Sequence, residues 1–228
     1  MGIKTDGGIA VAGSALVDEI NEIEAYPEVG RLAQIYGIKR AAGGLVPNVG
    51  IDIRRINPAL TVRAYGKIGR DEKGEFLLNT LRENGVDISG MKQSETLGTS
   101  FTQVMSAAGG ERTFFTYAGA SAFFGYGDIP FEKITAKIFH LGYFLLLEQV
   151  DNGDGVKILK ELKKRNIKTS IDLVSSAAGG YEKVLPCLPY VDYLIINELE
   201  AAALCGEKDT ENLRNLAEKL KAKGVRES

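Results

Sequence analysis

Short apolar runs alternate with longer amphipathic segments along most of this chain. The apolar runs have the length of buried strands and lie at Ile9–Ala12, Val62–Gly66, Ile138–Leu141, Thr169–Asp172 and Tyr193–Ile196. The amphipathic segments have the length of helices and lie at Val49–Ile56, Glu72–Asn84, Val156–Asn166 and Thr210–Lys223. Strands that alternate with helices in this way form a mainly parallel sheet covered by helices. The pattern predicts an α/β fold with residues 1–228 in one domain.

Two stretches, 22–40 and 99–117, do not follow this alternation. The second has apolar and polar residues in turn on both sides of the Gly109-Gly110 pair, which is typical of antiparallel strands joined by a tight turn. We expect the two stretches to form a small separate sheet. Such a sheet can act as a lid over a ligand, and a pair of plain surface hairpins is the alternative.

The charge balance excludes some partners. The chain has 28 Lys and Arg against 30 Asp and Glu, a formal net charge of −2, so it offers no excess of positive charge for a nucleic acid backbone. Its longest apolar stretch, Phe139–Leu147, is too short to cross a membrane. We therefore expect a cytoplasmic protein with no nucleic acid and no membrane partner.

Few residues offer the chemistry of hydrolases or metalloenzymes. His140 is the only histidine and lies in an apolar run, which favours a hydrogen-bonded strand residue over a catalytic one. Cys187 and Cys205 form no C-x-x-C pair, which favours buried thiols over a disulfide or a zinc site. Tyr143 and Phe144 follow the third expected strand and either line a ligand site or belong to the core.

A glycine pair and two polar residues are the first candidates for a ligand site. Gly43 and Gly44 lack Cβ atoms and precede Asn48 at the start of an expected helix, so a ligand could reach backbone amides there. Asp18 follows the first strand, at the edge where open α/β sheets bind ligands, and a carboxylate can accept bonds from adjacent hydroxyls. The alternatives are a tight turn with Asn48 as the helix cap, and a loop-capping aspartate.

A second candidate pair follows the last expected strand. Asn197 and Glu200 are three residues apart, so at the start of a helix they share one face at its positive end, where phosphate oxygens and hydrated Mg²⁺ can be held. The alternative is an ordinary helix cap with an acidic first turn.

Five segments follow one another along the chain: Gly43-Gly44 with Asn48, then Gly66–Gly74, Gly85–Asp87, Ala118–Ala120 and Asn197-x-x-Glu200. Taken in this order, they resemble the motifs of the ribokinase/PfkB family of ATP-dependent carbohydrate kinases. The resemblance implies a ribokinase-like sheet with a β lid, and phosphoryl transfer from MgATP to a sugar hydroxyl. It also implies that the lid sheet can form a homodimer interface.

The resemblance assigns roles to individual residues. It implies that Asp18, Gly43, Gly44 and Asn48 bind the sugar, and that Glu148 contributes a further sugar contact. Two more residues, Asn197 and Glu200, match the family's motif for phosphate and Mg²⁺, with Glu200 acting on the metal through water.

One family element has no match in these 228 residues. The glycine-rich Asp-Thr-x-Gly-Ala-Gly-Asp segment, which the resemblance places after Asn197-x-x-Glu200 and whose last Asp deprotonates the sugar hydroxyl, is not found. We therefore expect the sequence to represent the first two-thirds of such a kinase, with the C-terminal part of the fold missing, and to be inactive alone.

Two other functions remain as alternatives. A sugar-binding or regulatory module without catalysis would keep the same pocket residues. A nicotinamide-dependent oxidoreductase fits the alternation, but Gly13-Ser14-Ala15-Leu16 stands where its G-x-G-x-x-G segment would be, and no G-x-x-x-x-G-K-[ST] loop occurs.

Overall fold

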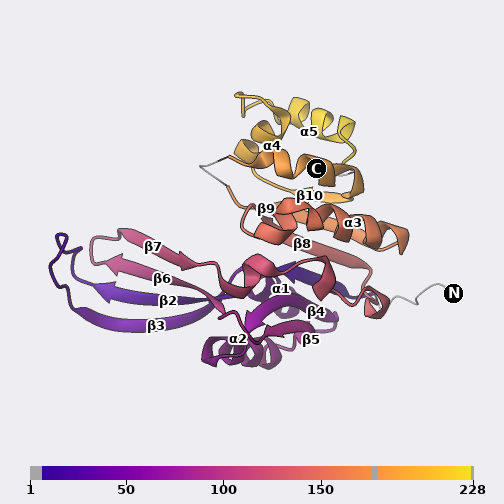
Figure 1. The fold of residues 1–228 in the computed structure, drawn as a ribbon. Coiled ribbons are helices and arrows are strands. Elements are labelled where there is room, and N and C mark those ends of the chain that lie inside the picture. The colour runs from indigo at the N-terminus through magenta and orange to yellow at the C-terminus, as the bar shows by residue number, and fades with distance from the viewer. Residues whose placement is uncertain (1–6, 176–178, 227–228) are drawn as a thin grey trace.

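The computed structural model describes residues 7–175 and 179–226, and these form two sheets (Figure 1). The larger sheet has six parallel strands in the order β10-β9-β8-β1-β4-β5. Its strands are β1 (Ile9–Gly13), β4 (Val62–Gly69), β5 (Asp87–Ser94), β8 (Ile138–Phe144), β9 (Lys168–Leu173) and β10 (Tyr193–Ile195). The α/β fold and all five expected strands are confirmed.

Helices cover both faces of this sheet. The α-helices are α1 (Leu45–Ile56), α2 (Glu72–Glu83), α3 (Gly155–Lys164), α4 (Glu198–Cys205) and α5 (Leu213–Ala222). Short 3₁₀ turns lie at Gly119–Phe123, Tyr126–Asp128, Phe131–Lys133, Tyr181–Lys183 and Leu185–Tyr190, and a π turn lies at Val150–Asp154. Successive residues of β1 enter different cores, since Ala10 and Ala12 pack on the side of α3 whereas Val11 packs on the side of α1 and α2.

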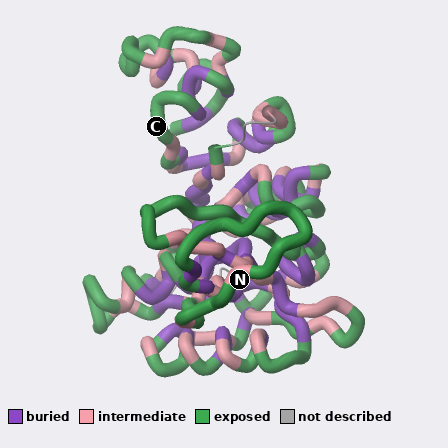
Figure 2. The backbone as a smooth tube through the Cα atoms, turned by 90° about the vertical axis from the view of Figure 1, so that its left-hand side faces the viewer, coloured by how far each residue is buried: buried purple, intermediate pink, exposed green. Residues whose placement is uncertain are grey.

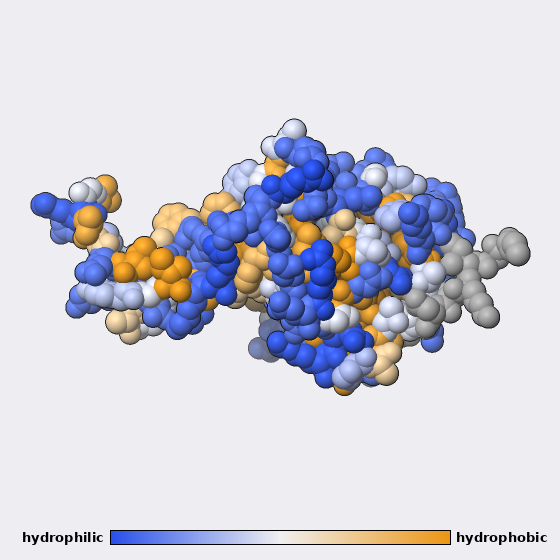
Figure 3. Space-filling view, turned by 90° about the horizontal axis from the view of Figure 1, so that it is seen from below, coloured by the Kyte–Doolittle hydropathy of each residue, from blue (hydrophilic) through white to orange (hydrophobic). Residues whose placement is uncertain are grey.

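The smaller sheet contains the two stretches for which a separate sheet was expected, and it is called the lid below as a label. Its strands are β2 (Leu16–Ile23), β3 (Ile35–Gly43), β6 (Ser100–Ala107) and β7 (Arg112–Tyr117), in the order β3-β2-β6-β7. It projects from the body in Figure 1, and the burial colours of Figure 2 show exposed lid backbone in front of a buried interior. Apolar side chains are exposed on it (Figure 3), among them Ile38, Phe114 and Phe115.

The lid differs from the expectation in two ways. Its first hairpin runs from Leu16 to Gly43 rather than over 22–40, because only Ser14 and Ala15 separate β1 from β2. Its two hairpins are internally antiparallel, but they meet through a parallel pairing of β2 with β6, so the lid is a mixed sheet. A parallel pair of strands cannot be joined by a tight turn, but β2 and β6 belong to hairpins that are far apart in the chain, so no turn has to join them.

Side chains of α2 hold the base of the lid. Asp71 caps α2 by accepting from the Gly74 amide at 2.8 Å, and also accepts from the amide and hydroxyl of Thr99, just before β6, at 2.7 and 2.6 Å. The carboxylate of Glu19 in β2 lies 3.0 Å from Lys73 Nζ and 3.4 Å from an Arg40 guanidinium nitrogen. The lid is therefore tied to the body on the side of α2.

No helix in the described ranges 7–175 and 179–226 has the length and apolar character needed to span a membrane.

Candidate functional site

Asp18 lies against Gly43 in the lid. The structure places Asp18 within β2, opposite Ala41 of β3, rather than in a loop after the first strand. A Cβ atom on Gly43 would collide with Asp18 Oδ2, so only glycine leaves room for this carboxylate. Among the described residues none donates a hydrogen bond to Asp18, and its partial burial raises the pKa of the carboxyl. A half-buried carboxylate without a partner is suited to accept hydrogen bonds from a ligand.

The α1 helix begins directly after this contact. Gly44 precedes its first residue with φ +84°, and a Cβ atom there would lie 2.7 Å from the Ser14 carbonyl oxygen. The Ser14 hydroxyl accepts from the Leu45 amide at 3.1 Å, and its carbonyl accepts from the Val46 amide at 3.0 Å. Ser14 therefore satisfies two of the amides that a helix start leaves open.

This arrangement corrects the expectation for Asn48. The helix starts four residues earlier than the predicted Val49, so Asn48 is not the cap but an exposed residue of the first turn, whose amide donates to the Gly44 carbonyl at 3.3 Å. The earlier start puts Pro47 in the first turn, where proline is accepted because its missing N–H costs nothing. Asn48 thus lies one turn along α1 from the Asp18 and Gly43 contact.

Glu148 lies in a separate hollow near the base of the lid. The hollow has a volume of about 320 Å³, and Glu148 lines it with Phe123, Asn152 and Asp154. Two residues before Phe123, the Ser121 hydroxyl contacts both the amide and the carbonyl of Ala15 at 3.2 and 3.0 Å. Ser121 therefore links the segment that lines the hollow to the segment that leads into β2.

Asn197 and Glu200 form a reciprocal cap on α4. The Asn197 side chain accepts from the Glu200 amide at 2.9 Å, and the Glu200 carboxylate accepts from the Asn197 amide at 3.1 Å. The hydroxyl of Ser175 joins them, donating to Glu200 at 2.7 Å and accepting from the Asn197 side chain at 3.1 Å. The ordinary helix cap offered as the alternative is present, and it fixes both side chains at the positive end of α4.

The same residues fit Mg²⁺ only through water. Glu200 is buried and each of its oxygens already accepts one hydrogen bond, but a carboxylate has about four acceptor sites. In the described part of the chain no three His, Cys, Asp or Glu side chains are grouped to hold a metal. Mg²⁺ commonly keeps several waters and takes its other ligands from substrate phosphates, and that mode suits this site.

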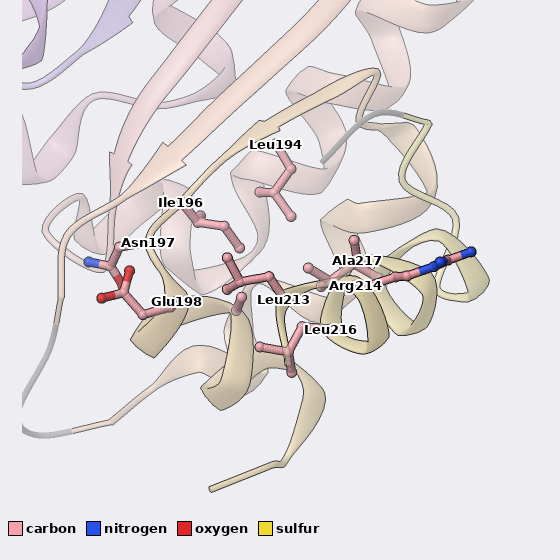
Figure 4. Close-up of a pocket in the computed structure, with 10 residues that line it drawn as sticks. Leu194, Ile196, Asn197, Glu198, Leu213, Arg214, Leu216 and Ala217 are labelled. Carbon is pink, nitrogen blue, oxygen red and sulfur yellow. The ribbon is translucent and has the colours of Figure 1, made fainter. Parts of the chain in front are cut away.

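An apolar groove lies beside the α4 cap (Figure 4). It measures about 380 Å³, and Leu194, Ile196, Leu213 and Leu216 converge in it between β10 and the last two helices. Its aliphatic lining does not suit a polyol, which needs hydrogen-bonding partners.

Ser14 and Ser175 were not predicted from the sequence. Each follows a buried strand within two residues. A serine at that place is a signal that its hydroxyl can form hydrogen bonds at the start of a nearby helix. His140 is a hydrogen-bonded strand residue, as the sequence favoured, and Phe144 belongs to the core. Both cysteines are free thiols, but only Cys187 is buried as expected, whereas Cys205 is partly exposed.

The model of the pfkB family carbohydrate kinases matches residues 9–228, and the chain belongs to this family.

Its similar curated relatives include fructokinases and a ribokinase. The chain is 30% identical over 187 residues to a probable chloroplastic fructokinase-6 of Arabidopsis thaliana, covering 78% of this chain and 48% of that protein. It is 26% identical to the ribokinase of Schizosaccharomyces pombe, covering 96% of this chain and 70% of that one. The chain thus spans about half the length of the first relative.

Solved structures share its fold. The ribokinase of Thermotoga maritima superposes with a TM-score of 0.79 at 21% identity, covering 96% of this chain and 69% of that one. A ribokinase of Arabidopsis thaliana, solved in complex with ribose and ATP, gives a TM-score of 0.79 at 21% identity, covering 96% and 70%. These likenesses establish the ribokinase-like fold.

Proposed function

We propose that this chain supplies the sugar-binding part, and a portion of the phosphate-binding part, of an ATP-dependent carbohydrate kinase. The observation that carries the proposal is the half-buried Asp18 carboxylate, which lies against Gly43 at the base of the lid without a partner among the described residues. Keeping a carboxylate there has a cost in stability, and that cost is offset when sugar hydroxyls donate to it.

The sugar lies, in this proposal, between the lid and the start of α1. Asp18 accepts from two neighbouring hydroxyls, a geometry that two carboxylate oxygens provide well. Gly43 and Gly44 keep the backbone open to the ligand, and the exposed Asn48 amide offers both a donor and an acceptor one turn away. Glu148 provides a further contact from its hollow near the lid.

The phosphates lie, in this proposal, at the other end of the same sheet edge. The positive end of α4 favours negative oxygens, and the cap holds Asn197 and Glu200 in fixed orientations there. ATP would be the phosphoryl donor, and Glu200 would hold Mg²⁺ through a water molecule. When bound, the metal would neutralise charge on the transferring phosphoryl group.

These 228 residues contain no match to the family's glycine-rich aspartate segment, so the proposal assigns no catalytic base to them. We expect the 228-residue chain to bind sugar and to form no phosphorylated product. The same observation favours a second candidate function, a non-catalytic sugar-binding or regulatory module.

Two measurements test the proposal. Calorimetry with D-fructose and D-ribose should show binding by the 228-residue chain, and Asp18→Ala should abolish it. Ile56→Ala, at the exposed end of α1, is the control that should leave the affinity unchanged. A chain that binds neither sugar refutes the proposal. A chain that binds sugar and also releases ADP from MgATP contradicts only the expected inactivity.

We further propose that the lid forms a homodimer interface. Ile38 and Phe115 are 72% and 60% exposed, and the strand register places them on the same face of a sheet that projects from the body. Burying such side chains against a second copy would stabilise both. Sedimentation should show a dimer that Phe115→Glu converts to a monomer. A wild-type monomer at high concentration would contradict this interface.

A further inference from the structure

The turn after β8 has an unfavourable backbone. Tyr143 and Leu145 have φ values of +61° and +76°, a region that residues with a Cβ atom seldom adopt. Both lie at the carboxyl end of a central strand of the parallel sheet, the edge where α/β folds bind ligands. Backbone strain persists only where surrounding contacts impose it, and such positions concentrate at functional sites.

Two carboxylates impose this backbone. The pairing of β8 with β9 is interrupted between Leu141 and Phe144, and there the Tyr143 amide donates to Asp172 Oδ1 at 2.5 Å. Asp151 accepts from the Leu145 amide at 2.9 Å. It also accepts from the Leu147 amide at 3.0 Å, so side chains replace the strand partners that the turn lacks.

Asp172 is itself held by a buried pair. His140 Nε2 lies 3.4 Å from Asp172 Oδ2, and His140 Nδ1 lies 2.9 Å from the Ser170 hydroxyl. His140 and Ser170 face each other in the pairing of β8 with β9, and both are more than nine-tenths buried. The ring therefore orients the carboxylate toward the turn.

Contacts place the turn between the two halves of the proposed site. A Cβ atom on Gly142 would collide with Leu45 of α1 on one side and with Asp172 Oδ1 on the other. Leu45 directly follows the Gly43-Gly44 pair, and Asp172 is three residues before Ser175, which joins the α4 cap. The turn thus lies between the sugar side and the phosphate side.

We propose that Asp172 is a positioning residue that fixes the turn Tyr143–Leu146 as a wall of the sugar site. The partly exposed Tyr143 is the residue of that wall that contacts and selects the sugar. His140 and Ser170 act through Asp172 and do not touch substrate. This inference rests on the proposed sugar kinase function and assigns residues to it that the family motifs above do not include.

Three variants separate the roles. Asp172→Ala removes the acceptor for the Tyr143 amide and should weaken sugar binding about tenfold or more. Asp172→Asn keeps an oxygen for that amide, and His140 can accept from its NH₂ group in the other tautomer, so affinity should return to within about threefold of wild type. Tyr143→Gly adopts the positive φ freely, so it should keep the fold and lose affinity through the missing ring.

The experiment combines calorimetry and hydrogen exchange on the 228-residue chain. D-fructose and D-ribose are the probes, and exchange is followed in a peptide covering 141–147. Protection there should fall in Asp172→Ala and persist in Tyr143→Gly. Asp87→Ala, which removes one partner of Arg63 near the opposite edge of the sheet, controls for a general loss of stability and should leave affinity unchanged.

The outcomes are distinct. Unchanged sugar affinity in Asp172→Ala or Tyr143→Gly overturns this inference alone, as does unchanged exchange in Asp172→Ala. Equal loss in Asp172→Ala and Asp172→Asn also overturns it, because the acceptor oxygen would then not matter. A wild-type chain that binds neither sugar overturns the proposed function, and the substrate role of Tyr143 with it.

Discussion

Asp71 is expected to contribute more to stability than a helix cap normally does. Its carboxylate accepts from Gly74 at the start of α2, and also from the amide and hydroxyl of Thr99 where the chain enters β6. Thr99 is 2% exposed, so water cannot replace a lost partner. Asp71→Ala therefore removes a cap and leaves a buried amide without an acceptor.

The magnitude follows from these contacts. Loss of an N-cap costs about 1 kcal/mol, and an unsatisfied buried donor costs about 1–3 kcal/mol more. We expect the free energy of unfolding to fall by about 3 kcal/mol, which lowers the Tm of a domain this size by about 6–12 °C. Asn212→Ala is the matched control, because Asn212 caps α5 through one exposed bond to the Asn215 amide and should cost only about 1 kcal/mol.

Calorimetric melting at several pH values tests the reasoning. Burial raises the pKa of Asp71, but the hydrogen bonds from Thr99 and Gly74 outweigh it and hold this pKa below its ordinary value. The stabilisation is therefore complete above the unfolded pKa of about 3.9 and is lost as the pH falls through the folded value. The gap between wild type and Asp71→Ala should close in that acid range. If Asp71→Ala melts like Asn212→Ala at pH 7, the carboxylate is only a cap and the tie to the lid is refuted.

Three further predictions follow from other sites. Asp18→Asn should weaken sugar binding and raise the Tm at pH 7, because burial raises the pKa of Asp18 and makes its ionised form destabilising. The gain in Tm should vanish at pH 3, where Asp18 is protonated. An unchanged Tm at pH 7 would contradict this prediction. Gly142→Ala should lower the free energy of unfolding by about 1–3 kcal/mol in urea titrations, because the added methyl group meets Leu45 and Asp172. The control is Gly127→Ala, where the methyl group has open space, and it should cost less than half as much. Burial raises the pKa of Cys187 to about 12, so its thiol should react slowly at pH 8. Mass spectrometry of the folded chain treated with iodoacetamide at that pH should find Cys205 modified first. Equal modification of the two cysteines would contradict this prediction.

The body of the fold was predictable because its strands are buried on both faces. Continuous apolar runs such as Ile138–Leu141 mark such strands directly. The strand that the sequence did not indicate, β5, lies at the edge of the sheet, and its residues Asp87–Ser94 are mostly polar. The helix α2 was predicted to within one residue, since Asp71 and Gly85 mark its two ends.

The candidate site was predicted by residue type and less well by position. Asp18 was expected directly after the first strand and Asn48 at a helix start, but they lie within a lid strand and one turn into a helix. The two-residue connection between β1 and β2 leaves no trace in the periodicity of the sequence. The turn at Tyr143 could not be foreseen. Its backbone depends on Asp172, a residue 29 positions later that only the folded sheet brings into contact.

The parallel join between β2 and β6 has a consequence for the order of assembly. Leu16 pairs with Ser100, and β4, α2 and β5 all lie between them in the chain. During synthesis the unit of β1, α1 and β4 can form early, because its contacts are close in the chain. The hairpin of β2 and β3 has no partner along the edge of β2 until β6 has been synthesised. During synthesis that edge is a place where a chaperone or a neighbouring copy could pair before the chain's own strand arrives.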